Sequence, residues 1–161
     1  MQPLFQDRNE WLKFLAILES WLGTPYRHLQ MAKGRGADCT LFIGACYLEA
    51  GILTAVTYDY YPRDWHIHTD EEVVLESLVR HFTSHLTAGL RAERIEDLET
   101  PLMRGDFLCL KQPERKVTHH AAVYLGENRI IHALTRLGVT RSDWEPYWSR
   151  RLTRIFRLKK E

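Results

Sequence analysis

The chain has 161 residues, of which 45% are hydrophobic and 27% are charged, and its net charge at pH 7 is +1. These values predict a single globular domain over residues 1–161, large enough to bury a core. The near-neutral charge argues against nucleic acid or an acidic membrane surface as a partner, and no apolar stretch approaches the ~20 residues that span a bilayer. Three scattered cysteines are too few for a disulfide framework and indicate a reducing compartment.

The first half of the chain is predicted to be helical. Apolar residues recur at helical spacing over 10–22, 39–51 and about 70–86. Asn9 is a candidate N-cap for the first helix, and Thr69 with Glu72 forms a capping box before the third. Residues 52–61 are expected to be irregular or partly strand.

The second half is predicted to be an antiparallel sheet. Short apolar runs separated by turn residues predict strands over 107–111, 119–125, 129–133, 138–141 and 152–158. Helices followed by a strand meander favour an α+β fold in which the N-terminal helices pack on the C-terminal sheet.

Cys39 is the first candidate for chemistry. It follows the loop glycines Gly34 and Gly36 and stands at the start of the second helix. The exposed N–H groups and positive dipole end of a helix N-terminus favour a thiolate, the form in which cysteine is a nucleophile. The alternative is plain packing, since cysteine is among the residues that are most often buried.

His120 and His132 are candidates for the base that a nucleophilic cysteine needs and for the group that orients this base. If residues 126–128 form a three-residue loop, the numbers of opposed residues on the two strands sum to 254. His132 then faces Ala122 and lies diagonally beside His120 on the same face. A two-residue loop would place His132 on the other face. In the scheme with the three-residue loop, His119 points the opposite way from His120.

Several motifs now resemble those of the NlpC-type cell-wall peptidases, which are compact relatives of papain. The resemblance covers roughly residues 10–158, and its motifs stand in the family's order: Leu22-Gly23-Thr24-Pro25-Tyr26-Arg27, Asp38-Cys39-Thr40, Gly105-Asp106-Phe107, His120-Ala121-Ala122-Val123-Tyr124-Leu125-Gly126 and Ile131-His132-Ala133. The resemblance implies a compact papain-like α+β domain that hydrolyses peptidoglycan stem peptides between D-glutamate and a diamino acid. It implies no metal and no cofactor.

The resemblance also implies roles for individual residues. Cys39 would be the nucleophile, His120 the base and His132 the residue that orients His120. The hydroxyl of Tyr26 would help the Cys39 N–H to hold the oxyanion. Asp38 would help to position the substrate amine, and we expect His68 at the rim of the cleft, where it would contact the substrate.

Two replacements depart from the family pattern, and two other segments bear on how the protein would be delivered. Thr40-Leu41 replaces the usual Ser-Gly, and Ala122 replaces a Gly, which bears on substrate choice. Residues 1–8 lack the pattern of a secretory signal, so we expect the protein to be cytoplasmic as made. Residues 61–68 resemble a branch of the family carried by phage-like elements, which suggests delivery to the cell wall by a phage-like particle.

Two alternatives remain open from the sequence. One is an amidase or acyltransferase of the same superfamily, acting on a lipid or another amide in an apolar cleft that the five tryptophans could line. The other is a zinc-binding or structural module, although the spacing matches no compact zinc pattern. The chemically capable ligands are Cys39, His66, His68, His81, His85, His119, His120 and His132.

Overall fold

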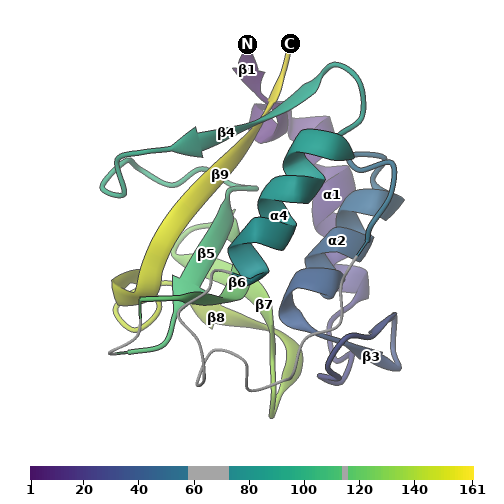
Figure 1. Ribbon diagram of the computed structural model, residues 1–161, viewed down its shortest axis with the longest axis vertical. Coiled ribbons are helices and arrows are strands. Elements are labelled where there is room, and N and C mark those ends of the chain that lie inside the picture. The colour runs from purple at the N-terminus through teal and green to yellow at the C-terminus, as the bar shows by residue number, and fades with distance from the viewer. Residues whose placement is uncertain (58–72, 114–115) are drawn as a thin grey trace.

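Three helices lie against one face of a seven-stranded sheet in this computed structural model, which describes residues 1–57, 73–113 and 116–161 (Figure 1). The helices are α1 (Arg8–Ser20), α2 (Cys39–Glu49) and α4 (Val73–Ser84), with 3-10 turns η1 (Leu4–Gln6) and η2 (Ser149–Arg151). The predicted α+β fold, with helices packed on an antiparallel sheet, is confirmed.

The sheet has the strand order β1-β9-β5-β6-β7-β8, and β4 also pairs with β9. All of these pairings are antiparallel. The strands are β1 (Gln2–Pro3), β4 (Leu90–Ile95), β5 (Phe107–Lys111), β6 (Thr118–Gly126), β7 (Arg129–Leu134), β8 (Gly138–Asp143) and β9 (Leu152–Lys160). Because β1 pairs with β9, the two chain ends lie side by side (Figure 1). A separate hairpin, β2 (Met31–Ala32) with β3 (Gly36–Ala37), precedes α2.

Several predicted boundaries were wrong. Helix α1 begins at Arg8, and its N-cap is Asp7, whose side chain accepts the N–H of Glu10, instead of Asn9. Strand β4 was missed because half of its residues are charged and it lies at the edge of the sheet, where β9 is its one partner among the described residues. The Thr69–Glu72 capping box lies outside the described residues.

Both faces of the sheet are buried, and alternation along the strands divides the side chains between them. On the helix side, Phe107, Ala121 and Ile131 belong to the main core. On the other side, Leu108, Ala122 and Ile130 join a smaller apolar cluster that includes Trp144. The even-numbered positions of β6 and β7 therefore face away from the helices.

A buried ion pair links Arg157 within β9 to Asp106, the residue before β5. The Nε and Nη2 of Arg157 donate to the two carboxylate oxygens of Asp106 at 2.8 and 2.7 Å, and the side chain of Asp106 is 1% exposed. Asp106 also accepts the N–H of Met103. It follows Gly105, whose φ of +85° favours glycine, so the turn and the ion pair fix the entry of the chain into β5.

Candidate active site

Cys39 is the first residue of α2, and Asp38 before it is the N-cap. Asp38 Oδ1 accepts the N–H groups of Thr40 and Leu41, and its Oδ2 accepts the N–H of Leu29. The carboxylate is buried and holds both the helix start and the preceding loop. These bonds fix the backbone on either side of Cys39.

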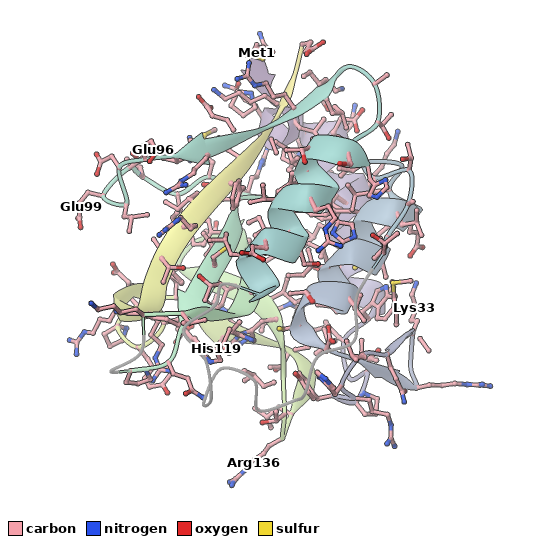
Figure 2. The ribbon with its side chains drawn as sticks, in the orientation of Figure 1. Met1, Lys33, Glu96, Glu99, His119 and Arg136 are labelled. Atoms are coloured by element: carbon pink, nitrogen blue, oxygen red, sulfur yellow. The ribbon has the colours of Figure 1, made fainter. Side chains whose placement is uncertain are left out.

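The thiol of Cys39 reaches the sheet where two strands separate. Pairing between β6 and β7 ends at Val123 and Ile131, although β6 begins at Thr118 and β7 runs on to Leu134. Helix α2 packs against both strands. Cys39 Sγ lies 4.0 Å from the carbonyl oxygen of His119, and the N–H of Ala121 also faces the sulfur. The sulfur therefore contacts the β6 backbone on both sides of His120, near the position of His119 in Figure 2.

The β6–β7 hairpin has the register that the sequence predicted, but it is formed differently. The turn has only two residues, Glu127 and Asn128, both with positive φ, and it is closed by Gly126 opposite Arg129. A bulge at Leu125 then restores the pairing of Tyr124 with Ile130. Without this bulge, the two-residue turn would turn His132 to the other face.

The two imidazoles are in direct contact. His120 Nε2 lies 2.9 Å from His132 Nδ1, and both side chains are buried. The second nitrogen of His132, Nε2, lies 2.8 Å from the hydroxyl oxygen of Ser142 on β8. The three groups form one hydrogen-bonded row, and the ring nitrogen of His120 outside it is Nδ1.

An aromatic side chain covers this pair. The ring of Trp148 lies 4.8 Å from that of His132 and 5.4 Å from that of His120, measured between centroids. The guanidinium of Arg151 lies 4.0 Å above the ring of Tyr147 and 5.4 Å from that of Trp148. The segment around η2 thus shields the imidazoles from water and places a cation beside them.

Burial keeps the proposed nucleophile and base neutral at rest. Burial, reinforced by the negative charge of Asp38, raises the pKa of the Cys39 thiol to about 12. Burial, with the charges of His132, His119 and Arg151, holds the pKa of His120 well below its usual value. Desolvation and the charge of Asp38 therefore oppose the preference for a thiolate that the helix N-terminus gives Cys39.

The other predicted site residues are placed less directly. Tyr26 is half-buried, and its backbone forms an isolated β-bridge with Ala37, two residues before Cys39. The oxyanion role of Tyr26 and the substrate contact of Asp38 stay predictions. His68, like His66, lies outside the described residues.

Sequence reasoning missed Ser142, Trp148 and Arg151. Ser142 lies beyond the predicted end of its strand at 141, although strand alternation would have placed it diagonally beside His132 had the strand been extended to Asp143. Trp148 and Arg151 belong to the loop and 3-10 turn after β8. No periodic pattern marks such a segment.

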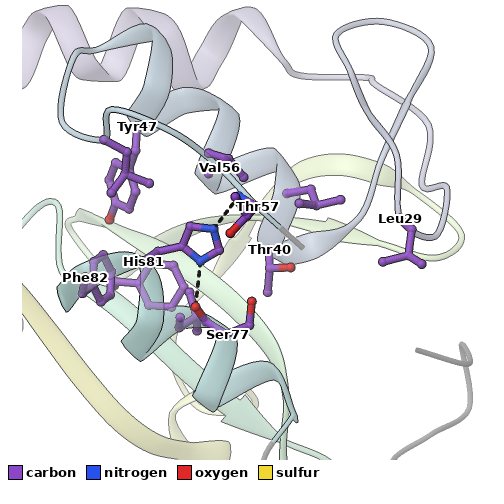
Figure 3. Close-up of a pocket in the computed structure, with 13 residues that line it drawn as sticks. Leu29, Thr40, Tyr47, Val56, Thr57, Ser77, His81 and Phe82 are labelled. Atoms are coloured by element: carbon purple, nitrogen blue, oxygen red, sulfur yellow. Dashed lines mark hydrogen bonds between the residues drawn. The ribbon is translucent and has the colours of Figure 1, made fainter. Parts of the chain in front are cut away.

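A small apolar cavity lies between α2 and α4 and is not lined by His120 or His132 (Figure 3). The cavity has a volume of about 30 Å³, which is enough for one or two waters and far below the volume of an ordinary small-molecule site. His81 spans its wall, since its Nε2 accepts the N–H of Thr57 and its Nδ1 donates to Ser77 O. The cavity offers little support to an acyltransferase with an apolar cleft.

The described part of the chain shows neither a cluster of metal ligands nor a membrane-spanning helix. Within residues 1–57, 73–113 and 116–161, no three His, Cys, Asp or Glu side chains gather in a way that could hold a metal ion. Among the same residues, none of the helices has the length and apolar character needed to cross a membrane.

The chain resembles curated bacterial proteins over most of its length. A probable endopeptidase of Haemophilus influenzae is 28% identical over 139 residues, which are 86% of this chain and 68% of that protein. The probable endopeptidase NlpC of Escherichia coli is 26% identical over 142 residues, which are 88% of this chain and 73% of the relative.

Solved structures share the fold. The NlpC/p60 domain of the peptidoglycan hydrolase SagA has a TM-score of 0.53 at 19% identity, over 90% of this chain and 96% of that one. An NlpC/P60 family protein from Bacillus cereus has a TM-score of 0.58 at 18% identity, but this chain spans only 39% of its length. Residues 23–157 match the NlpC/P60 family, and the chain therefore belongs to that family.

Proposed function

We propose that this protein is a cysteine peptidase that hydrolyses amide bonds in peptidoglycan stem peptides, with Cys39 as nucleophile, His120 as base and His132 as the residue that orients His120. Family membership and relatives named as probable endopeptidases support a peptidase hydrolase. The observation that carries the assignment of residues is the contact of the Cys39 sulfur with the β6 backbone on both sides of His120.

The proposed reaction starts from a neutral pair. Because the thiol and the imidazole are both uncharged at neutral pH, Cys39 loses its proton to His120 Nδ1 as the sulfur attacks the amide carbonyl. The Cys39 N–H and the hydroxyl of Tyr26 would hold the oxyanion. His120 then protonates the leaving amine, and a thioester of Cys39 remains.

Water completes the cycle. His120, neutral again after it has protonated the amine, accepts a proton from the water that attacks the thioester. The tetrahedral intermediate collapses, the C–S bond breaks, and the thiol recovers the proton from His120. The products are a carboxylic acid and an amine, and no cofactor enters the balance.

The substrate bond belongs to the same proposal. We place the cut between D-glutamate and the diamino acid of a stem peptide, as the resemblance to NlpC-type peptidases implies. His68 would contact the substrate beside the nucleophile, and Asp38 would help to position the substrate amine. Since both oxygens of Asp38 accept backbone N–H groups, the part of Asp38 in recognition would be indirect, through the shape of the loop at Leu29.

Digestion of purified peptidoglycan tests this proposal. Wild type, Cys39→Ala and Cys46→Ala are incubated with walls of differing chemotype, and the released fragments are identified by mass spectrometry. Cys46 is fully buried in the same helix and is a matched control for loss of a thiol. We expect stem-peptide fragments from wild type and Cys46→Ala only. Release by Cys39→Ala, or none from any wall type with wild type, would overturn the proposal.

A further inference from the structure

The hydroxyl of Ser142 ends the hydrogen-bonded row that starts at His120. Ser142 lies opposite Ile130 on β8, and Thr140, two residues before it, lies opposite His132. The side chain of Ser142 therefore stands diagonally beside His132 on the same face, with its oxygen 2.8 Å from Nε2. His132 is completely buried, whereas Ser142 is half-buried.

The row can be protonated in two ways. In the first, His120 Nε2–H donates to His132 Nδ1, and His132 Nε2–H donates to Ser142, which leaves a lone pair on His120 Nδ1. In the second, all donors are reversed: Ser142 donates to His132, His132 donates to His120, and the proton of His120 is on Nδ1. Only the first arrangement gives His120 a base nitrogen outside the row.

A protonated His120 permits only the first arrangement. Once Nδ1 has taken the proton of Cys39, both nitrogens of His120 carry hydrogen, so His132 Nδ1 must accept and His132 Nε2–H must donate. Within the described residues, the acceptor that lies within hydrogen-bond distance of that buried N–H is the oxygen of Ser142. A buried donor without an acceptor costs the full desolvation of the group.

We propose that Ser142 is a positioning residue for catalysis, which accepts the N–H of His132 and thereby selects the tautomer of the His120–His132 pair that can take a proton from Cys39. The inference rests on the proposed role of His120 as base. It adds to that role a fourth residue, which touches neither the nucleophile nor the substrate and acts only through His132.

The surroundings of His120 make the inference testable by pH. The titratable and charged groups around it are His119 on its own strand, His132 on β7 and Arg151 on η2. The thiol of Cys39 on α2 contacts the backbone carbonyl of the neighbouring His119. Ser142 is uncharged, so its replacement leaves these charges in place. A displaced titration of His120 in an uncharged variant at position 142, Ser142→Ala or Ser142→Thr, therefore reports the hydrogen-bonded row.

Alkylation of Cys39 by iodoacetamide at a series of pH values is the measurement, with the modified peptide quantified by mass spectrometry. This readout needs no peptidoglycan, so it can succeed or fail independently of the proposed substrate. Cys46 and Cys109 are fully buried and serve as internal references. The variants are Ser142→Ala, Ser142→Thr and Ser142→Asp, with Thr140→Ala as matched control, because the hydroxyl of Thr140 bonds Arg141 O on the same strand.

In Ser142→Ala, the protonated state of His120 loses its acceptor. We expect the acid limb of the alkylation profile to move to lower pH by about one unit and the plateau rate to fall about 10- to 100-fold. Ser142→Asp supplies a permanent acceptor and should move the limb to higher pH. Ser142→Thr should retain the wild-type profile, as should Thr140→Ala.

Equal acid limbs in wild type, Ser142→Ala and Ser142→Asp would overturn the inference, even if the rates fell, because a purely structural role changes the amount of active protein without changing the titration. Displacement of the limb in Thr140→Ala as large as that in Ser142→Ala would overturn it too. If the limbs move as expected and no wall fragment is released by wild type, the positioning role stands and the peptidoglycan substrate fails.

Discussion

His120 Nε2 and His132 Nδ1 lie 2.9 Å apart because the turn and the bulge of the β6–β7 hairpin compensate for each other. A two-residue turn alone would place the two rings on opposite faces, and a one-residue bulge alone would do the same. Together they retain the register in which Val123 faces Ile131. The contact of the two rings therefore depends on the backbone at Gly126, whose φ is +90°.

Gly126→Ala tests this dependence. A side chain at this φ is strained, so we expect a loss of about 1 kcal/mol of stability, or about 2–4 °C in Tm, together with slower alkylation of Cys39. Gly89→Ala is the matched control, since Gly89 also has a positive φ of 84° with open space around its Cα. The control should lose similar stability and keep the alkylation rate. Equal alkylation rates in the two variants would contradict the argument.

The sequence was enough to predict the helix and strands that carry Cys39, His120 and His132, but not the residues that surround the two imidazoles. Periodicity found α2 and strands β5 to β9, and the placement of His120 and His132 on one face followed from parity alone. The three-residue loop was the wrong reason for the right register, because a sequence does not distinguish a longer loop from a tight turn followed by a bulge. Trp148 and Arg151 were missed since loop residues carry no period.

The state of the thiol was also beyond sequence reasoning. The start of a helix favours the anion, and that local effect is visible in the sequence. Burial of Cys39 under the sheet and the charge of buried Asp38 act in the opposite direction and are larger. Both depend on how the helix docks, which no local pattern records.

The buried ion pair between Asp106 and Arg157, two residues far from Cys39 in the sequence, is expected to contribute strongly to stability. Arg157→Met leaves a carboxylate that is 1% exposed without its cation, so we expect a loss of about 3 kcal/mol, or about 6–12 °C in Tm. Arg94→Met is the control, because the Arg94–Glu96 pair is exposed and should change stability by less than about 1 kcal/mol.

Removal of both charges distinguishes the stability lost with the ion pair from the stability lost with side-chain packing. If the loss in Arg157→Met comes from the uncompensated carboxylate, adding Asp106→Leu should recover part of it. Thermal unfolding of the single and double variants measures this. A double variant less stable than Arg157→Met would assign the effect to the packing of Asp106 instead.

Arg151 predicts a displaced pH profile. Its positive charge contributes to the lowered pKa of His120, so Arg151→Gln should raise that pKa. Because His120 must be neutral to accept the proton of Cys39, the acid limb of activity should move to higher pH in the variant. Arg150→Gln, an exposed neighbour on the same 3-10 turn, is the control and should leave the limb unchanged. Identical profiles in the two variants would refute the charge argument.

Buried His132 predicts that stability falls in acid. Burial lowers its pKa from 6.5 to about 4, so between these pH values the unfolded chain binds a proton that the folded chain does not. Stability must then rise with pH through this window, and about 3 kcal/mol should be lost between pH 7 and pH 4. Urea unfolding at intervals of half a pH unit measures the slope. His132→Asn removes the titrating group and should flatten it, leaving the part due to His120; an unchanged slope would mean that the imidazole of His132 takes up its proton equally in the folded and unfolded chains.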